Sequence, residues 1–260
     1  MEIAERQGEV AGIETHWREA GHAPVLYVHG VPTAGWDWEP FLARTGGIAP
    51  DLPGFGRSAK PGDFDYSIDG YNRYLEAFCG QVGLARFSLV VHDFGGLALV
   101  LAQRFPERIE RLVLFSCLPL VPGYHWHRVA RAWRTPVLGE LTMGFTTRWG
   151  FRRSLPSEIA DRAYDDFDHG TQRAILKLYR SVPAEELPRH GERLGELRCP
   201  ALVLWPSRDP YIAPDFGPRY ADALGGQTTL ETIDAGHWPW LDRPALVERV
   251  AEFLGPADER

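Results

Sequence analysis

A strand that stops at one polar residue before two glycines constrains this chain more than any other feature. Phe87 to Val91 is a short β-branched and apolar run, which predicts a buried parallel strand. After Asp93, the pair Gly95 and Gly96 permits a tight turn into residues 97–105, which have helical spacing. A strand, one exposed residue, a glycine turn and a helix together describe a nucleophile elbow. The sequence therefore predicts that Asp93 stands above the end of a parallel strand.

The aspartate at this position decides which chemistry the turn can support. A carboxylate that attacks a saturated carbon forms an ester, which water can later cleave, whereas a serine would form an inert ether. Asp93 is also ionised at neutral pH and needs no base to activate it. The pattern therefore favours displacement at an sp3 carbon, such as that of an epoxide or an alkyl halide. The alternative is that Asp93 only caps the helix beginning at Gly95, and the rest of the chain must decide between the two.

Strand and helix patterns alternate along most of the chain. The expected strands are residues 9–17, 24–28, 47–50, 87–91, 109–115, 201–205 and 228–233. The expected helices are residues 33–42, 67–82, 97–105, 214–224 and 241–253. This alternation predicts an α/β fold with a mostly parallel sheet and helices on both faces. Ligands bind beyond the carboxyl ends of such strands, and Asp93, Asp209, His237 and the loop at Val31 all follow strands.

The alternation stops in the middle of the chain. Residues 122–190 are helical in pattern, aromatic and rich in arginine, with a net positive charge, whereas the whole chain carries a formal charge of -7. Strand periodicity returns at Pro200. We therefore expect a core of residues 1–121 and 191–260, with a helical cap of residues 122–190 laid over it.

Composition limits the partners that we expect. The charge of -7 argues against nucleic acid and anionic membranes. Cys79, Cys117 and Cys199 have no metal-ligand spacing, and His125 and His127 lack a further ligand nearby, so we expect free thiols, no metal and no cofactor. The N-terminus has no apolar signal core. We therefore expect a cytoplasmic monomer or homodimer that acts on a small apolar organic substrate and water.

Several motifs resemble those of the α/β-hydrolase fold family over nearly the whole chain. The matching segments are His29-Gly30-Val31-Pro32, Asp51-Leu52-Pro53-Gly54-Phe55-Gly56-Arg57-Ser58, His92-Asp93-Phe94-Gly95-Gly96, Ser207-Arg208-Asp209 and Gly236-His237. Such a resemblance implies a sheet of about eight strands. Within the family, an aspartate at the elbow is similar to the epoxide hydrolase and haloalkane dehalogenase branch. The resemblance implies that Asp93 is the nucleophile, Asp209 the acid that orients the histidine, and His237 the base. It also implies an oxyanion hole formed by the backbone N–H groups of Val31 and Phe94.

The two branches differ in their leaving group. Many haloalkane dehalogenases stabilise the halide with the N–H groups of an Asn after His-Gly and a Trp after the nucleophile. This chain has Val31 and Phe94 there, and neither side chain has an N–H. An epoxide oxygen needs a proton, and residues 176–180 resemble the segment from which epoxide hydrolases supply a tyrosine. The resemblance therefore implies an epoxide hydrolase, with Tyr179 as the proton donor and Tyr124 as a second candidate.

The alternative is a haloalkane dehalogenase. Residues 132–140 resemble a dehalogenase cap, and Trp126, Trp133 or Trp149 offers an indole N–H to a halide. Fluoroacetate dehalogenases carry an arginine after the nucleophile, where this chain has Phe94. A serine-free elbow argues against an esterase, and an intact triad argues against a non-catalytic binding protein on the same fold. Four side chains are expected to contact the substrate: His29, Tyr124, Trp126 and Trp238.

Overall fold

One sheet carries the fold, and the computed structural model describes residues 1–255 of the chain. Its strands are β1 (Ala4–Val10), β2 (Ile13–Ala20), β3 (Val25–Val28), β4 (Gly47–Pro50), β5 (Phe87–Asp93), β6 (Ile109–Cys117), β7 (Ala201–Pro206) and β8 (Thr228–Ile233). They lie in the order β1-β2-β4-β3-β5-β6-β7-β8. β2 is antiparallel to both of its neighbours, β1 and β4. The six strands β4-β3-β5-β6-β7-β8 are parallel to one another. The predicted fold class, a mostly parallel α/β sheet of about eight strands, is confirmed.

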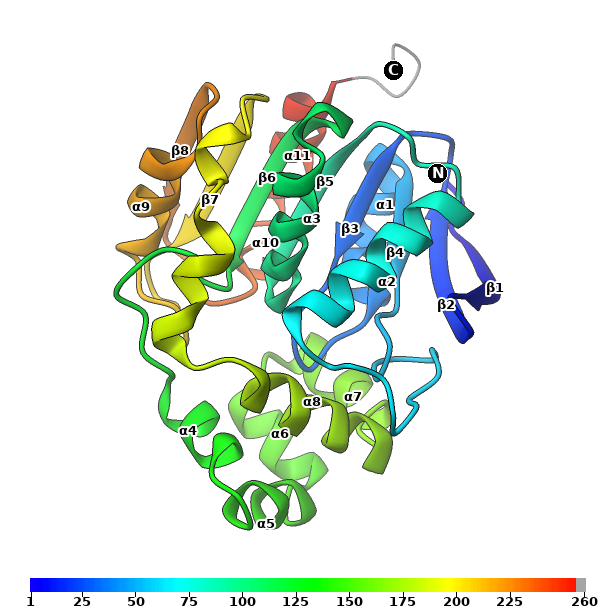
Figure 1. Cartoon of the computed structure of the whole chain (residues 1–260), viewed down its shortest axis with the longest axis vertical. Helices are drawn as coiled ribbons and strands as arrows, with labels where there is room; N and C mark the ends of the chain where they lie inside the picture. The colour runs from blue at the N-terminus through cyan, green and yellow to red at the C-terminus, as the bar shows by residue number, and fades with distance from the viewer. Residues whose placement is uncertain (256–260) are drawn as a thin grey trace.

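Helices cover both faces of this sheet, with α2 and α3 in front and α1 and α11 behind in the view of Figure 1. The core helices are α1 (Glu39–Thr45), α2 (Ile68–Gln81), α3 (Leu99–Arg104), α9 (Phe216–Ala223), α10 (Pro239–Asp242) and α11 (Ala245–Leu254). The 3-10 turns of the core are η1 (Gly35–Trp38), η2 (Phe94–Ala98) and η3 (Pro106–Arg108). In α2, the Ser67 hydroxyl accepts the Gly70 N–H and caps the first turn. The apolar side chains that follow at helical spacing are buried against the sheet.

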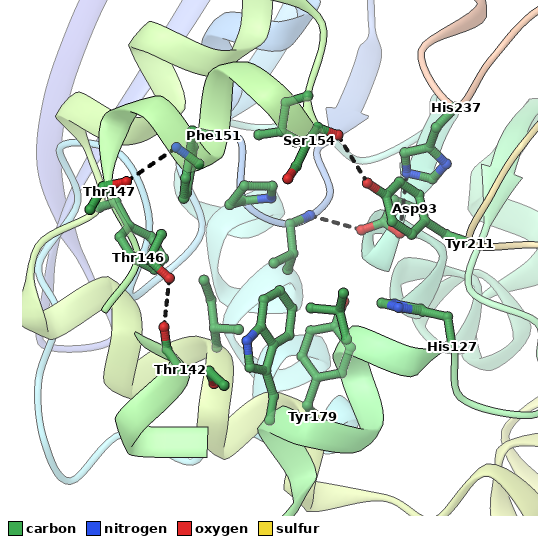
Figure 2. A pocket seen from close by; sticks show the side chains of 18 of the residues that line it. Asp93, His127, Thr142, Thr146, Thr147, Phe151, Ser154, Tyr179, Tyr211 and His237 are labelled. Carbon is green, nitrogen blue, oxygen red and sulfur yellow. Dashed lines mark hydrogen bonds and ion pairs between the residues drawn. The ribbon is translucent and has the colours of Figure 1, made fainter. Parts of the chain in front are cut away.

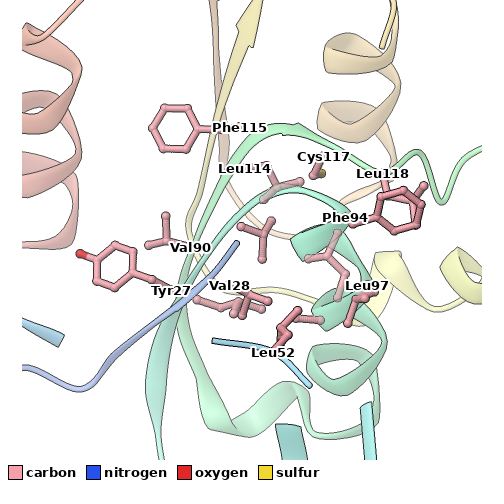
Figure 3. Packing of buried hydrophobic residues seen from close by; sticks show 14 of the residues in the cluster. Tyr27, Val28, Leu52, Val90, Phe94, Leu97, Leu114, Phe115, Cys117 and Leu118 are labelled. Carbon is pink, nitrogen blue, oxygen red and sulfur yellow. The ribbon is translucent and has the colours of Figure 1, made fainter. Parts of the chain in front are cut away.

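The central strands are apolar because both of their faces are covered. Val90 on β5, Val28 on β3 and Leu114 on β6 are fully buried. Figure 3 shows Val28 and Leu114 on the side of the sheet that faces Phe94 and Leu97, and Val90 on the other side with Tyr27. Burying each such side chain stabilises the fold by roughly 1.5–3 kcal/mol. This packing holds the end of β5, where Asp93 lies, against strands on both sides.

Between β6 and β7, the described chain forms helices and no strand. These elements are α4 (Arg128–Arg134), α5 (Leu138–Gly144), α6 (Arg148–Ser154), α7 (Ser157–Asp165), α8 (His169–Ser181), η4 (Ala184–Gly191) and η5 (Leu194–Glu196). Figure 1 shows α4 to α8 gathered at one end of the sheet, with α5 outermost. The Trp36 indole donates to Asp166 across the boundary at 2.9 Å, and Arg162 pairs with Glu39 at 2.8 Å. The division into core and cap at residues 122 and 190 stays a prediction.

Two predicted elements differ in the structure. The single edge strand expected over residues 9–17 is a hairpin of β1 and β2, because Ala11 and Gly12 both have positive φ and reverse the chain there. The single helix expected over residues 241–253 is two helices, α10 and α11, because Pro244 lacks the N–H needed to continue the first. Within residues 1–255, every helix is too short or too polar to cross a lipid bilayer.

Candidate active site

Asp93 lies on a sharp turn at the end of β5 and has a backbone φ of 49° and ψ of -126°. A non-glycine residue with positive φ is strained, and such residues are enriched at functional sites. The turn is crowded as well: a Cβ on Gly95 would lie 2.0 Å from the Val28 carbonyl oxygen, and one on Gly30 would lie 2.3 Å from Asp93 Cβ. The Asp93 side chain makes no hydrogen bond to the turn that it begins. The alternative that Asp93 serves as a helix cap is therefore not supported by this geometry.

The Asp93 carboxylate has two facing partners. The Val31 N–H donates to Oδ1 at 2.8 Å, and His237 Nε2 lies 3.5 Å from Oδ2. Burial by itself would raise the pKa of Asp93, but the imidazole of His237 and the Val31 N–H outweigh it and lower the pKa. Phe94, the other expected oxyanion donor, follows Asp93 as the first residue of η2. The site therefore holds an ionised carboxylate beside one of its two predicted backbone donors.

His237 is held between two carboxylates. Its Nδ1 lies 2.6 Å from Asp209 Oδ2, on the side of the ring opposite Asp93. Asp209 also accepts the Ser116 hydroxyl on Oδ2 and the N–H groups of Tyr211 and Ile212 on Oδ1, at 2.7 and 3.1 Å. These contacts leave Asp209 ionised and fix its orientation relative to the imidazole.

The charges in this arrangement shift the pKa values of His237 and Asp209. Burial opposes the charged form of His237, yet Asp209 and Asp93 together raise its pKa to about 10. Burial likewise opposes ionisation of Asp209, but His237 and the Ser116 hydroxyl lower its pKa to about 2. At neutral pH the resting site is therefore an imidazolium between two carboxylates.

A cavity of about 410 Å³ opens above Asp93 and is lined on its other side by the helices between β6 and β7. Its walls are mostly apolar, with Val31 and Pro32 from the loop after β3 and Trp133, Phe151 and Ile175 from those helices. Figure 2 shows Asp93 and His237 together at one side of the cavity, with Tyr179 and His127 below them. A cavity of this size and polarity suits a small, largely apolar organic molecule.

Three polar groups line the cavity near Asp93. The Tyr179 ring packs on Phe94 at 4.6 Å, and burial raises the pKa of its phenol well above its usual value. His127 Nδ1 accepts the Ala130 N–H, and burial lowers the pKa of His127, so the neutral ring carries its proton on Nε2. The Tyr211 ring lies 4.9 Å from that of His237. Tyr179 and His127 therefore each offer a hydrogen-bond donor to a ligand in the cavity.

The side chains expected to contact substrate are divided between the cavity and its surroundings. Trp238 lines the cavity, but its indole N–H donates to Asp37 Oδ2 at 3.2 Å. Tyr124 and Trp126 pack on each other outside the residues that line the cavity, and Trp126 Nε1 has no hydrogen-bond partner among the described residues. His29 lies under the loop, where its Nδ1–H donates to the Gly30 carbonyl oxygen at 2.8 Å and its Nε2 accepts the Leu52 N–H at 3.0 Å. The structure therefore brings only Trp238 of these four to the cavity.

Sequence reasoning missed two residues of this site and undervalued a third. Ser116 precedes Cys117 at the end of β6, where no sequence motif marks it. Tyr211 lies two residues after Asp209, and this closeness in sequence is the only signal for it. His127 stands out in the sequence only as a histidine without the further ligands of a metal site. Among residues 1–255, no group of three or more His, Cys, Asp or Glu side chains is arranged to hold a metal ion.

Comparisons with known proteins give related matches. A family model described as alpha/beta hydrolase fold matches residues 23–244. The chain is 34% identical to a haloalkane dehalogenase of Agrobacterium fabrum, over 93% of this chain and 88% of that protein. It is 34% identical to a 2-hydroxy-6-oxo-2,4-heptadienoate hydrolase of Pseudomonas putida, over 95% of both. The crystal structure of haloalkane dehalogenase DbeA from Bradyrhizobium elkani matches with a TM-score of 0.84 and 26% identity, covering 97% of this chain and 98% of that chain.

Proposed function

This chain belongs to the α/β-hydrolase fold family, and we propose that it displaces a leaving group from a saturated carbon through an ester on Asp93. The observation that carries the proposal is the carboxylate at the turn after β5. Asp93 lines the cavity, with its Oδ1 held by the Val31 N–H and its Oδ2, the oxygen that attacks the carbon, 3.5 Å from His237 Nε2. A carboxylate in that position forms an alkyl ester directly.

The first step uses the resting charges of the site. Asp93 Oδ2 attacks the carbon, the bond to the leaving group breaks, and the leaving group departs with the bonding electrons. Ester formation removes the negative charge of Asp93, which is one of the two carboxylates that raise the pKa of His237. The pKa of His237 therefore falls after the first step, and the ring can release its proton and become a base.

The second step regenerates the carboxylate. Neutral His237 Nε2 takes a proton from water, and the resulting hydroxide attacks the Asp93 carbonyl carbon. Asp209 stabilises the imidazolium that forms, through its 2.6 Å contact with Nδ1. The Val31 N–H faces the developing oxyanion, a contribution of about 3 kcal/mol for one such donor. Collapse of the intermediate releases an alcohol and returns Asp93 to its ionised state.

The relatives favour a halide as the leaving group. A curated relative and a solved structure with high coverage of this chain are both named haloalkane dehalogenases. A halide leaves as an anion and is stabilised by hydrogen-bond donors. Of the three indoles considered for this role, Trp133 and Trp149 line the cavity and Trp126 does not, and the cavity also offers His127 Nε2–H and the Tyr179 hydroxyl. We therefore propose haloalkane hydrolysis as the first activity to test, with donors from this set replacing the side-chain N–H groups that Val31 and Phe94 lack.

Epoxide hydrolysis is the second candidate, and Tyr179 is the observation that favours it. The Tyr179 phenol lines the cavity above Asp93 and keeps its proton at neutral pH. An epoxide oxygen leaves as an alkoxide, which is far more basic than a halide and takes a proton from such a phenol. The third class, hydrolysis at a carbonyl carbon, is suggested by the name of the Pseudomonas putida relative. Asp93 argues against it, because a carboxylate attacking an acyl group would form an anhydride.

The ester intermediate tests the proposal directly. In His237→Gln, alkylation of Asp93 should proceed while hydrolysis stops, because only the second step needs a base. Intact-protein mass spectrometry after incubation with 1-bromobutane or styrene oxide should show a stable adduct that peptide mapping assigns to Asp93. His22→Gln, which changes an exposed histidine in the turn after β2, is the matched control and should form no stable adduct. An adduct on another residue, or undiminished turnover in His237→Gln, contradicts the assigned roles.

The leaving group is decided by a second pair of variants. Tyr179→Phe should slow epoxide opening by roughly 10²–10⁴-fold, the range for a positioned general acid, and should slow bromide displacement much less. Tyr124→Phe removes a hydroxyl from the same aromatic cluster outside the cavity and should leave both reactions unchanged. Bromide release from 1-bromobutane without any diol formation from styrene oxide would support haloalkane hydrolysis and contradict epoxide hydrolysis.

A further inference from the structure

A buried carboxyl group lies behind the triad, on the side away from the cavity. Asp37 in η1 is almost fully buried, and its Oδ2 accepts the Thr33 hydroxyl at 3.0 Å and the Trp238 indole N–H at 3.2 Å. Its other oxygen, Oδ1, has no hydrogen-bond partner among the described residues. His92 Nδ1, also buried and unpartnered, lies 3.9 Å from Asp37 Oδ2. Neither group takes part in the two steps described above.

The tautomer of His92 follows from its other ring nitrogen. Nε2 lies 2.9 Å from the carbonyl oxygen of His237, and a carbonyl can only accept, so Nε2 carries a proton. In the neutral ring, Nδ1 then presents a lone pair toward Asp37. An ionised Asp37 would also present only lone pairs, so two buried acceptors would face each other. Two facing buried acceptors are unfavourable, and a proton on Asp37 or on His92 Nδ1 removes the conflict.

The surroundings favour Asp37 as the carrier of that proton. The titratable or charged groups that act on Asp37 are His92 on β5, His237 in the loop after β8, and Arg162 on α7. Arg162 is paired with Glu39, and no arginine or lysine of the described residues contacts Asp37. Burial raises the pKa of Asp37 to about 7. For His92, burial and then the neighbouring charge of His237 lower the pKa to about 3.

We propose that Asp37 is a neutral carboxylic acid that donates its proton toward His92 Nδ1, and that it is a positioning residue for His237. The chain of contacts runs from Asp37 through His92 to the His237 carbonyl, and in parallel from Asp37 to Trp238, the next residue along the chain. The rings of His92 and His237 are 4.6 Å apart, so the same contacts set the orientation of the base. The gap of 3.9 Å is longer than a hydrogen bond and closes by a small rotation of the carboxyl group.

A neutral Asp37 also has an electrostatic consequence. An ionised carboxylate at this position would stabilise the imidazolium form of His237 and oppose its conversion to a base after ester formation. Keeping the proton on Asp37 therefore favours the second step of the proposed reaction. The inference rests on the proposed role of His237 for this kinetic consequence, but the location of the proton can be measured without any substrate.

The first experiment uses the resting protein. Nitrogen-15 NMR of the histidine side chains, with His92 assigned by its loss in His92→Gln, should show one N–H nitrogen and one nitrogen with a lone pair at pH 6. Two N–H nitrogens on His92 at that pH would show an imidazolium paired with ionised Asp37 and would overturn the proposal. This result does not depend on which substrate the protein hydrolyses, or on whether it hydrolyses one.

The second experiment uses Asp37→Asn and Asp37→Ala. Asparagine keeps one oxygen that can accept from Thr33 and Trp238 and has an NH2 group as a donor, and it cannot ionise, so it stands in for the neutral acid. Decay of the Asp93 ester should stay within about threefold of wild type in Asp37→Asn and should slow by about tenfold or more in Asp37→Ala. Slowing in Asp37→Asn as large as in Asp37→Ala would overturn the proposal. Since Asn cannot ionise, Asp37→Asn should also lose any limb near neutral pH from the pH profile of ester decay, and retention of that limb would contradict the assignment.

Discussion

Replacing Ser116 with alanine should slow hydrolysis of the ester and spare its formation. The Ser116 hydroxyl donates to Asp209 Oδ2, the oxygen that also contacts His237 Nδ1 at 2.6 Å. A hydrogen bond to a charged group contributes about 1.5–3 kcal/mol. Asp209 keeps the Tyr211 and Ile212 N–H groups on Oδ1, so it stays ionised and we take the lower end, about 1.5 kcal/mol. That value corresponds to roughly tenfold in the rate of a step that depends on the orientation of His237.

Rapid-quench mass spectrometry separates the two steps. The Asp93 adduct should form at the wild-type rate, because alkylation needs no base, and should decay roughly tenfold more slowly. Ser88→Ala is the matched control, since Ser88 is equally buried on the neighbouring strand β5 and its hydroxyl has no partner among the described residues. It should leave both rates unchanged. Equal slowing of both steps in Ser116→Ala, or decay at the wild-type rate, would refute the assignment of Ser116 to the orientation of Asp209.

Three further perturbations test the geometry around this site. Gly30→Ala should abolish adduct formation, because the new Cβ would lie 2.3 Å from Asp93 Cβ; normal alkylation would contradict the close approach. The pKa of His237 is raised to about 10 from an unfolded value of about 6.5, so its ion pairs stabilise the fold fully below pH 6.5 and this stabilisation is lost as the pH rises toward 10. The free energy of unfolding in urea should fall between pH 6.5 and pH 10 in wild type and should not show this fall in His237→Gln. Equal dependence of the unfolding free energy on pH in the two proteins would contradict a stabilising ion pair at His237. Phe145→Ser, at the exposed rim of the cavity, should change the free energy of unfolding by less than about 0.5 kcal/mol while raising KM for an apolar substrate.

Local sequence patterns were sufficient for the elements that depend on local physics. The apolar run of β5, the glycines after Asp93 and the return of strand periodicity at Pro200 predicted the turn, the sheet and the helical segment. Asp209 and His237 could be chosen because parallel strands bring their carboxyl ends to one edge. The structure places His237 Nε2 3.5 Å from Asp93 Oδ2, and Asp209 on the other side of the His237 ring, 2.6 Å from Nδ1. The turn, the sheet and the helical segment follow from strand period, glycine conformation and strand direction, whereas the roles of Asp209 and His237 were implied by the resemblance to the α/β-hydrolase fold family.

Other features depended on tertiary structure, because side-chain direction and packing between distant segments have no local signature. Trp126 and His127 are adjacent in sequence, yet only His127 lines the cavity, since the path of the chain before α4 turns Trp126 onto Tyr124. His29 belongs to a recognisable motif but points beneath its loop. Nothing in the sequence distinguishes Asp37 from other polar residues of the predicted helix over residues 33–42. Only the packing of η1 against β5 and the loop that carries His237 shows that the Asp37 carboxyl group is buried without a cation. The sequence by itself determined the chemistry that we propose for Asp93. The packing of the helices between β6 and β7 determined which hydrogen-bond donors line the cavity, because that depends on contacts between residues far apart in the chain.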